Sequence, residues 1–122
     1  RLNNKDGYEF KKSYPYPTGE DTLGLNCLND CNFNYPSKYS KFLLRGYGHV
    51  STSSTKKGIN GLYDMGGNVW EWVDIDDNSY KGTKGGSWWY GKNQMIQGYN
   101  ATKPKNMSAV YIGFRCVKDF KN

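Results

Sequence analysis

In the second half of the chain, apolar and polar residues alternate in short runs separated by glycines. Such alternation is typical of strands with one buried face. The best strand candidates are residues 69–73, 86–90 and 109–117. The last run places Val110, Ile112 and Phe114 on one face. Residues 91–108 are polar and contain Pro104, so a long loop is expected between the last two strands.

The first half is less periodic. Only residues 6–12 have a helical pattern, and prolines alternating with tyrosines from residue 14 favour an extended path. Residues 18–39 are rich in Asn, Asp, Ser, Gly and Pro, which predicts an irregular loop. Residues 41–50 are a further short strand candidate, followed by a polar connection. The pattern predicts a loop-rich α+β fold with short antiparallel strands.

The length of 122 residues supports a single domain covering residues 1–122. Aromatic residues reach 16%, which argues against disorder. No window is apolar enough for a membrane span. The net charge of +6 comes from scattered lysines without a nucleic-acid-binding motif, so we expect no nucleic-acid partner. Solubility or attraction to acidic glycans explains the charge equally well.

The cysteines are Cys27, Cys31 and Cys116, and their spacing matches no common zinc or redox motif. A local Cys27–Cys31 disulfide is sterically possible, and a bridge from Cys116 to one of the pair is the competing arrangement. His49 is the only histidine, which leaves little material for a histidine-based catalytic or zinc centre.

Residues 61–73, with the sequence GLYDMGGNVWEWV, combine paired glycines, two carboxylates and two tryptophans. Gly66 and Gly67 permit backbone angles closed to other residues. Asp64 and Glu71 supply the oxygen ligands that calcium prefers. The alternative is a tight turn whose carboxylates cap backbone N–H groups.

This stretch also resembles the signature of the formylglycine-generating enzyme (sulfatase-modifying factor) family. RLNNKDGYEF at residues 1–10, KGGSW at 84–88 and IGFRC at 112–116 resemble three further family segments in the same order. The resemblance implies a C-type-lectin-like fold. It also implies that the chain is the C-terminal portion of the family domain, with the N-terminal part absent.

The resemblance implies one structural calcium ion, bound by side-chain oxygens of Asp64 and Glu71 and by the carbonyls of Gly67 and Val69. A second family site often lies in the loop of residues 18–39, where Asp21, Asn26 and Asp30 are possible ligands. We expect a core of Leu62, Val69, Trp70, Trp72, Trp88, Ile112 and Phe114. Arg115 is expected to belong to the scaffold and to bind loop carbonyls.

Family enzymes oxidise a sulfatase cysteine with copper bound by two cysteines after the GGS segment. Counted from Ser87, those positions hold Met95 and Asn100, and thioether and amide groups do not replace thiolates for copper. The iron site of the related sulfoxide synthases needs histidines that are absent. We therefore expect no catalytic residues and no bound copper.

The sequence GGSW at residues 85–88, followed by a polar stretch that contains Pro104 and then by GFR at 113–115, also resembles the variable region of diversity-generating retroelement proteins. Those proteins display changeable residues on this fold. We accordingly predict a non-catalytic recognition module that presents residues 89–108 to a protein or glycan partner. The predicted ligand-binding residues are Trp89, Tyr90, Lys92, Gln94, Tyr99 and Lys103. The alternatives are a formylglycine-generating oxidase and a structural component of a cell-surface or viral assembly, in which the missing segment or other subunits would be partners. The expected location is extracellular, periplasmic or on a cell or virion surface.

Overall fold

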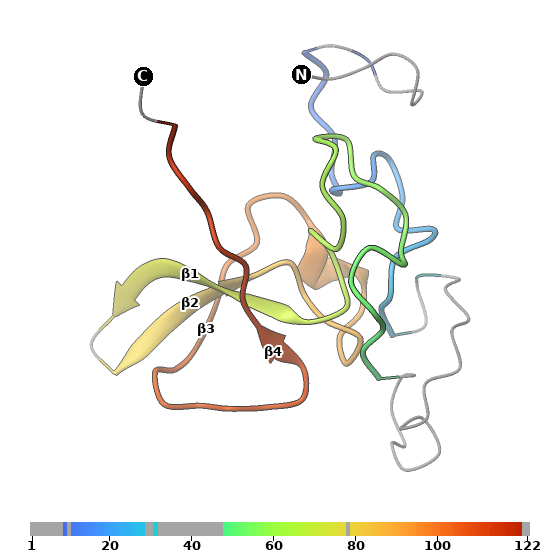
Figure 1. Cartoon of the computed structure of the whole chain (residues 1–122). Helices are drawn as coiled ribbons and strands as arrows, with labels where there is room; N and C mark the ends of the chain where they lie inside the picture. Colours follow the sequence, from blue (N-terminus) through green and yellow to red (C-terminus); the bar gives the residue numbers. More distant parts are fainter. Residues whose placement is uncertain (1–8, 10, 29–30, 32–47, 78, 121–122) are drawn as a thin grey trace.

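The computed structural model describes residues 9, 11–28, 31, 48–77 and 79–120. Its regular part is a sheet of four strands, β1 (Trp70–Asp77), β2 (Tyr80–Lys84), β3 (Ala101–Pro104) and β4 (Ile112–Gly113). The spatial order is β3-β2-β1-β4, with antiparallel β1–β2 and β2–β3 pairs and a parallel β1–β4 pair. A short 3-10 helix, η2 (Lys92–Met95), lies between β2 and β3 (Figure 1). The fold is therefore small and mostly sheet-like.

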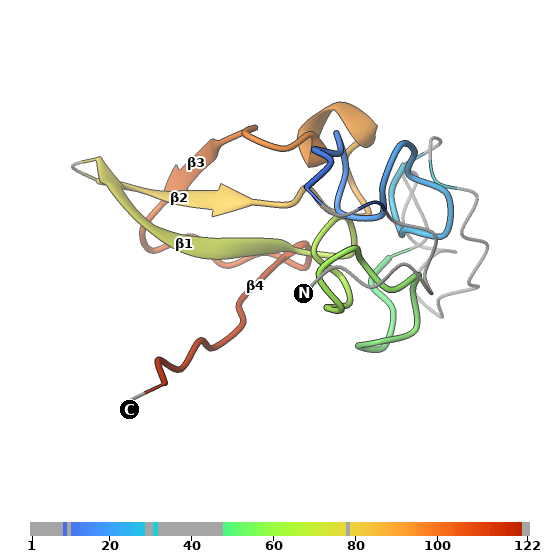
Figure 2. The same ribbon diagram turned by 90° about the horizontal axis from the view of Figure 1, so that it is seen from above.

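The sheet is curled because the pairing between its two inner strands, β1 and β2, is irregular. The β1–β2 register shifts between Trp72 and Asp76, and such a bulge bends and twists a strand. Gly82 of β2 lies opposite this bend, where a Cβ atom would be 2.9 Å from Cβ of Ile75. A glycine at this position lets the two strands approach closely. Figure 2 shows the curl from above.

Two buried asparagines connect the irregular segments of the first half to the sheet. The Asn26 amide donates to the Gly48 carbonyl at 2.9 Å and to Asn68 Oδ1 at 3.3 Å. Asn68 also accepts from the Val50 N–H at 2.9 Å, and its own N–H donates to the Asn26 carbonyl at 2.7 Å. Since buried backbone groups need partners, these side chains replace regular strand pairing in the loop-rich half.

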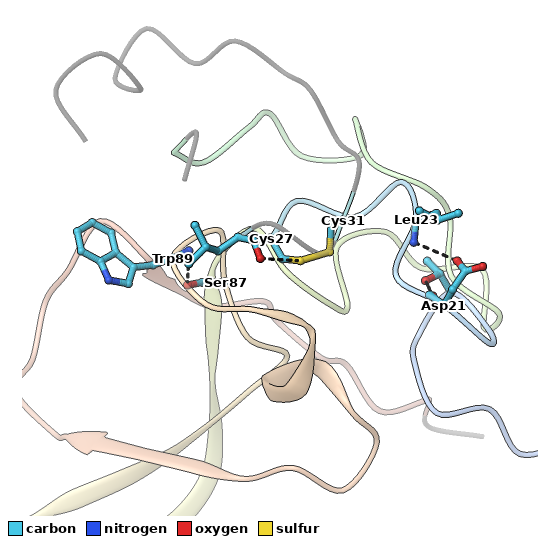
Figure 3. Close-up of a disulfide and its surroundings, with 8 residues drawn as sticks. Asp21, Leu23, Cys27, Cys31, Ser87 and Trp89 are labelled. Carbon is cyan, nitrogen blue, oxygen red and sulfur yellow. Dashed lines mark hydrogen bonds between the residues drawn. A yellow bond between two sulfur atoms is a disulfide. The ribbon is translucent and has the colours of Figure 1, made fainter. Parts of the chain in front are cut away.

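The core contains Leu25, Cys27, Cys31 and Met95, with Tyr16 packed against them. Cys27 and Cys31 form the disulfide, so the local pairing is the correct alternative, and Cys116 is a free, exposed cysteine. Figure 3 shows the disulfide between the turn that carries Asp21 and Leu23 and the turn that carries Ser87 and Trp89. The Leu28 N–H donates to the Tyr90 carbonyl at 3.0 Å, which attaches this region to the segment after β2.

The predicted core is only partly correct. Trp70 and Trp88 are each 1% exposed, which confirms them as core residues. Val69, Trp72 and Ile112 are half-buried. Leu62 is 48% exposed because it lies in a surface turn, and Phe114 is 75% exposed because the chain leaves the sheet after β4. For these two residues the prediction is wrong.

The strand predictions also need correction. The candidate at residues 69–73 is confirmed as part of β1, but residues 86–90 form a turn. Gly85 and Gly86 have φ values of 92° and 72°, which direct the chain out of the β2 path. The candidate at 109–117 is reduced to the two residues of β4, and Val110 lies outside it, 63% exposed. Conversely, β3 lies within the predicted loop; Pro104 ends this edge strand, where a missing N–H is tolerated.

In the first half, most of the predicted helix at 6–12 lies outside the described residues. Its described part is wrong, because Glu9, Lys11 and Lys12 are not helical and Lys11 has a φ of 64°. Residues 41–47 of the next strand candidate also lie outside the described part, and residues 48–50 are not in a strand. The described residues of the 18–39 segment are irregular, as predicted.

Candidate functional site

Three predicted ligand-binding residues gather around the ring of Trp70. The Tyr90 and Tyr99 ring centroids lie 5.2 Å and 6.3 Å from that of Trp70. Lys103 Nζ lies 4.7 Å from the Trp70 centroid and 5.5 Å from the Tyr90 centroid. We call these four residues the Trp70 cluster. Ammonium groups over aromatic faces at such distances form cation–π contacts.

Sheet register positions the Trp70 cluster. Trp70 begins β1, and Lys103 lies in β3, on the opposite side of β2 in the sheet order. The β2–β3 register pairs Lys81 with Lys103, and Tyr90 reaches the cluster from the turn after Gly86. Residues distant in sequence are therefore brought to one place by the strand order.

Two donors of the cluster lack acceptors within the described residues. No ion pair among those residues includes Lys103, and burial lowers the pKa of its ammonium group. The Trp70 side chain is 1% exposed, and its indole N–H is buried without an acceptor in the described part of the chain. A buried donor without a partner is costly. Of the two donors, only the half-buried Lys103 ammonium can be reached by an acceptor from solvent.

The other predicted ligand-binding residues are not in ring contact with Trp70. Trp89 packs edge-on against Trp88, with centroids 5.0 Å apart, and lies 5.7 Å from Tyr111. Lys92 and Gln94 belong to η2. Residue type alone suggested Trp89 as a ligand-binding residue as readily as Tyr90. Only the fold shows that Tyr90, Tyr99 and Lys103 gather around Trp70.

An apolar cleft of about 340 Å³ adjoins the Trp70 cluster at Tyr99. Six of its lining residues are Tyr14, Tyr16, Met65, Met95, Ile96 and Tyr99. Ile96 is 41% exposed and Met95 is buried, so the cleft has both an open rim and a closed floor. No local sequence pattern predicts this cleft, because its walls come from four separate segments at residues 14–17, 59–65, 84–85 and 95–99.

The predicted calcium ligands lie around a second pocket of about 370 Å³. Asp64, Val69 and Glu71 line it together with Phe114 and Arg115, whereas Gly67 is not among its lining residues. Asp64 accepts from the Ser53 N–H at 2.9 Å and from the Thr55 hydroxyl at 2.6 Å. The structure thus brings three of the four predicted ligands to one place.

Arg115 lines this pocket and binds Glu71, a second lining residue. Its Nε donates to both Glu71 oxygens at 2.9 and 2.8 Å, and its Nη2 to Glu71 Oε1 at 2.6 Å. Nη2 also donates to the carbonyls of Tyr63 and Asp64, each at 3.0 Å, which confirms the predicted scaffold role. The hydrogen bonds that Arg115 donates to Glu71 raise the pKa of Arg115, which reinforces the positive charge that arginine already carries at neutral pH. We call this arrangement the Arg115 clamp.

The carboxylates of Asp64 and Glu71 are oxygen ligands of the kind that calcium prefers. Arg115 lowers the net negative charge that they present to a cation. Each carboxylate oxygen has two lone-pair directions, so the observed hydrogen bonds leave acceptor capacity on Asp64 and Glu71. Arg115 offsets one of the two negative charges. No cluster of three or more His, Cys, Asp or Glu side chains suitable for a metal occurs among the described residues.

Of the residues considered for a second calcium site, the two that the structure describes, Asp21 and Asn26, are engaged in separate contacts. Asp21 caps a surface turn, accepting from the Leu23 N–H at 3.0 Å. The Asn26 side chain is engaged in the buried amide pair with Asn68. Asp30 lies outside the described residues.

Comparison with known families identifies residues 7–120 as a sulfatase-modifying factor enzyme 1-like domain. The chain belongs to this family. No curated protein matches it. In this sulfatase-modifying-factor-like domain, Met95 is buried below the cleft and Asn100 is exposed. No helix among its described residues is long and apolar enough to cross a membrane.

Proposed function

We propose that this domain is a non-catalytic recognition module that presents residues 89–108 to a partner. The observation that carries the proposal is the Trp70 cluster, where Lys103 lies over two aromatic rings beside an apolar cleft. Rigid aromatic side chains with a nearby cation are typical of binding hot spots. A C-type-lectin-like arrangement and a location outside the cytosol or on a surface belong to the same proposal, and the disulfide supports that location.

The competing function is a formylglycine-generating oxidase. The sequence has no cysteine between Cys31 and Cys116, and Cys27 and Cys31 are bonded to each other. A copper centre of two thiolates would therefore need a ligand set different from the family's. Copper titration combined with an assay on a sulfatase-type cysteine peptide separates the two functions. Turnover would overturn the recognition proposal.

The structural-component alternative is favoured by the segment after β4. Phe114, Val117 and Phe120 are exposed on a segment that projects from the body in both views (Figures 1 and 2). Exposed apolar side chains can mark an assembly contact. Sedimentation with and without Phe114→Ser and Val117→Ser would detect self-assembly through this segment.

Recognition can be tested with libraries of displayed peptides and immobilised glycans. Ligands selected on the native domain should lose most of their affinity for Tyr99→Ala. Tyr99 is 41% exposed, so this variant should keep the native melting temperature. Tyr90 is half-buried against Trp70 and Tyr111, so Tyr90→Ala should lose both affinity and some stability. If no ligand depends on Tyr99, the proposed surface is wrong.

We also propose that the clamp pocket holds one structural calcium ion, with Asp64 and Glu71 as its charged ligands and the Val69 carbonyl beside them; the Gly67 carbonyl, the fourth predicted ligand, does not line this pocket. The ion's positive charge would hold the carboxylates of Asp64 and Glu71 together and so stabilise the segment between them. Calcium at about 100 times its dissociation constant should add about 2.7 kcal/mol of stability. Chelation should thus lower the melting temperature of the native domain but not that of Asp64→Asn. Equal melting temperatures with and without calcium would refute the proposal.

A further inference from the structure

The Trp70 cluster has a chemical preference that its individual residues do not reveal. Its one charge is the Lys103 ammonium, which burial already disfavours and which lacks an ion-pair partner among the described residues. The Trp70 indole N–H also has no acceptor among those residues, but it is fully buried and lies out of reach of a ligand. A negatively charged ligand group would pair with the Lys103 ammonium, which is half-buried and therefore accessible from solvent.

The adjoining cleft indicates which kind of group should neighbour the anionic group in the ligand. Tyr99 lies beside Trp70 and also lines the cleft, so this one residue belongs to both the Trp70 cluster and the cleft. Met65, Met95 and Ile96 make the cleft apolar. A large hydrocarbon side chain gains free energy by entering such a cleft, whereas a glycan offers few apolar groups of that size.

We propose that the Trp70 cluster and its cleft bind a peptide segment in which a carboxylate side chain neighbours a large apolar side chain. The carboxylate pairs with Lys103, and the apolar side chain enters the cleft beside Met95 and Ile96. This inference rests on the proposed recognition function and names the ligand class of the same surface. The net charge of +6 favours the approach of acidic segments.

The test is a titration of the isotopically labelled domain with acetyl-Gly-Glu-Phe-Gly-amide, followed by NMR at peptide concentrations up to the millimolar range. The indole N–H signal of Trp70 and the amide signals of residues 96–103 should shift. Replacing Glu by Gln, or Phe by Ser, should weaken binding about tenfold or more, which corresponds to about 1.4 kcal/mol. No shift with the Glu-Phe peptide, or equal affinity for the Gln-Phe peptide, would overturn the inference.

Changing the charge of Lys103 tests the same interaction from the side of the protein. Lys103→Gln should abolish the preference for Glu over Gln, and Lys103→Glu should invert it in favour of a Lys-Phe peptide. Lys118→Gln removes the same charge from the exposed segment after β4 and should leave the preference unchanged. Circular dichroism of each variant confirms that it is folded before binding is compared. A folded Lys103→Gln variant that still prefers Glu would refute the role of Lys103.

The library experiment separates failure of this inference from failure of the recognition function. Ligands that depend on Tyr99 but lack an acidic residue, or that are glycans, would leave the recognition function intact and refute the peptide-carboxylate inference. A complete absence of Tyr99-dependent ligands would refute both. Enrichment of acidic residues next to Phe, Leu, Ile or Trp on the native domain but not on Lys103→Gln is the expected result.

Discussion

Replacing Arg115 by methionine should lower the free energy of unfolding by about 2–3 kcal/mol. The substitution keeps much of the apolar stem and removes only the guanidinium. Glu71, whose side chain is 16% exposed, would lose all the Arg115 contacts, and the carbonyls of Tyr63 and Asp64 would each lose a donor. Hydrogen bonds to charged groups contribute about 1.5–3 kcal/mol each, and partial exposure reduces what a pair of this kind contributes.

A double-mutant cycle of Arg115→Met and Glu71→Gln measures the interaction itself. Each single variant leaves one half-buried charged partner without its ion pair, whereas the double variant removes both charges, so its loss should be smaller than the sum of the two. The assay is urea unfolding followed by tryptophan fluorescence, with thermal unfolding alongside. For a domain of this size, a loss of 2–3 kcal/mol should lower the melting temperature by about 10 °C.

The Lys81–Asp74 pair serves as the control for this cycle. Its N–O distance is 3.3 Å, and the Asp74 side chain is 98% exposed, so Asp74→Asn should leave the melting temperature unchanged. All proteins are measured with and without a chelator, because a bound cation would contribute to the Glu71 effect. A coupling energy within about 0.5 kcal/mol of zero would show that the Arg115 clamp does not stabilise the fold.

Two further predictions concern the backbone and the disulfide. Gly67→Ala should strongly destabilise or unfold the domain, because Gly67 has a φ of 71° and a Cβ atom there would collide with the Asn26 carbonyl. Gly98→Ala shares the positive φ (88°) but meets nothing within 4 Å, so circular dichroism should show a folded protein that is less stable by about 1 kcal/mol. Reducing the Cys27–Cys31 disulfide should lower stability by about 2 kcal/mol, measured by urea unfolding with and without reductant; an unchanged midpoint would contradict this.

Where the sequence predicted the fold correctly, the information was local. Alternating aromatic, β-branched and charged residues placed a strand at β1, and spacing alone allowed the Cys27–Cys31 pair. The errors arise where backbone angles or sheet position decide. The positive φ values of Gly85 and Gly86 convert an apparent strand into a turn. Pro104 looked like a breaker but is tolerated at an edge.

The recognition surface was predictable as a list of residues but not as an arrangement. Residue types in the loop suggested Tyr90, Tyr99 and Lys103, and the structure brings these three together. That they meet over Trp70 depends on the pairing of β3 with β2 and of β2 with β1, which no local pattern encodes. The exposure of Phe114 was missed for the same reason, because the alternating pattern does not show where the chain leaves the sheet.

The parallel pairing of β4 with β1 determines which part of the sheet can form last during synthesis. β1, β2 and β3 are neighbours in both sequence and space, so they can pair as soon as they leave the ribosome. β1 keeps one unpaired edge, and Glu71 keeps an uncompensated charge, until Ile112 and Arg115 have been synthesised. An unpaired strand edge is a template for other chains. A delay between the emergence of β3 and that of β4 from the ribosome would therefore leave the nascent domain prone to intermolecular pairing at the edge that β4 later covers.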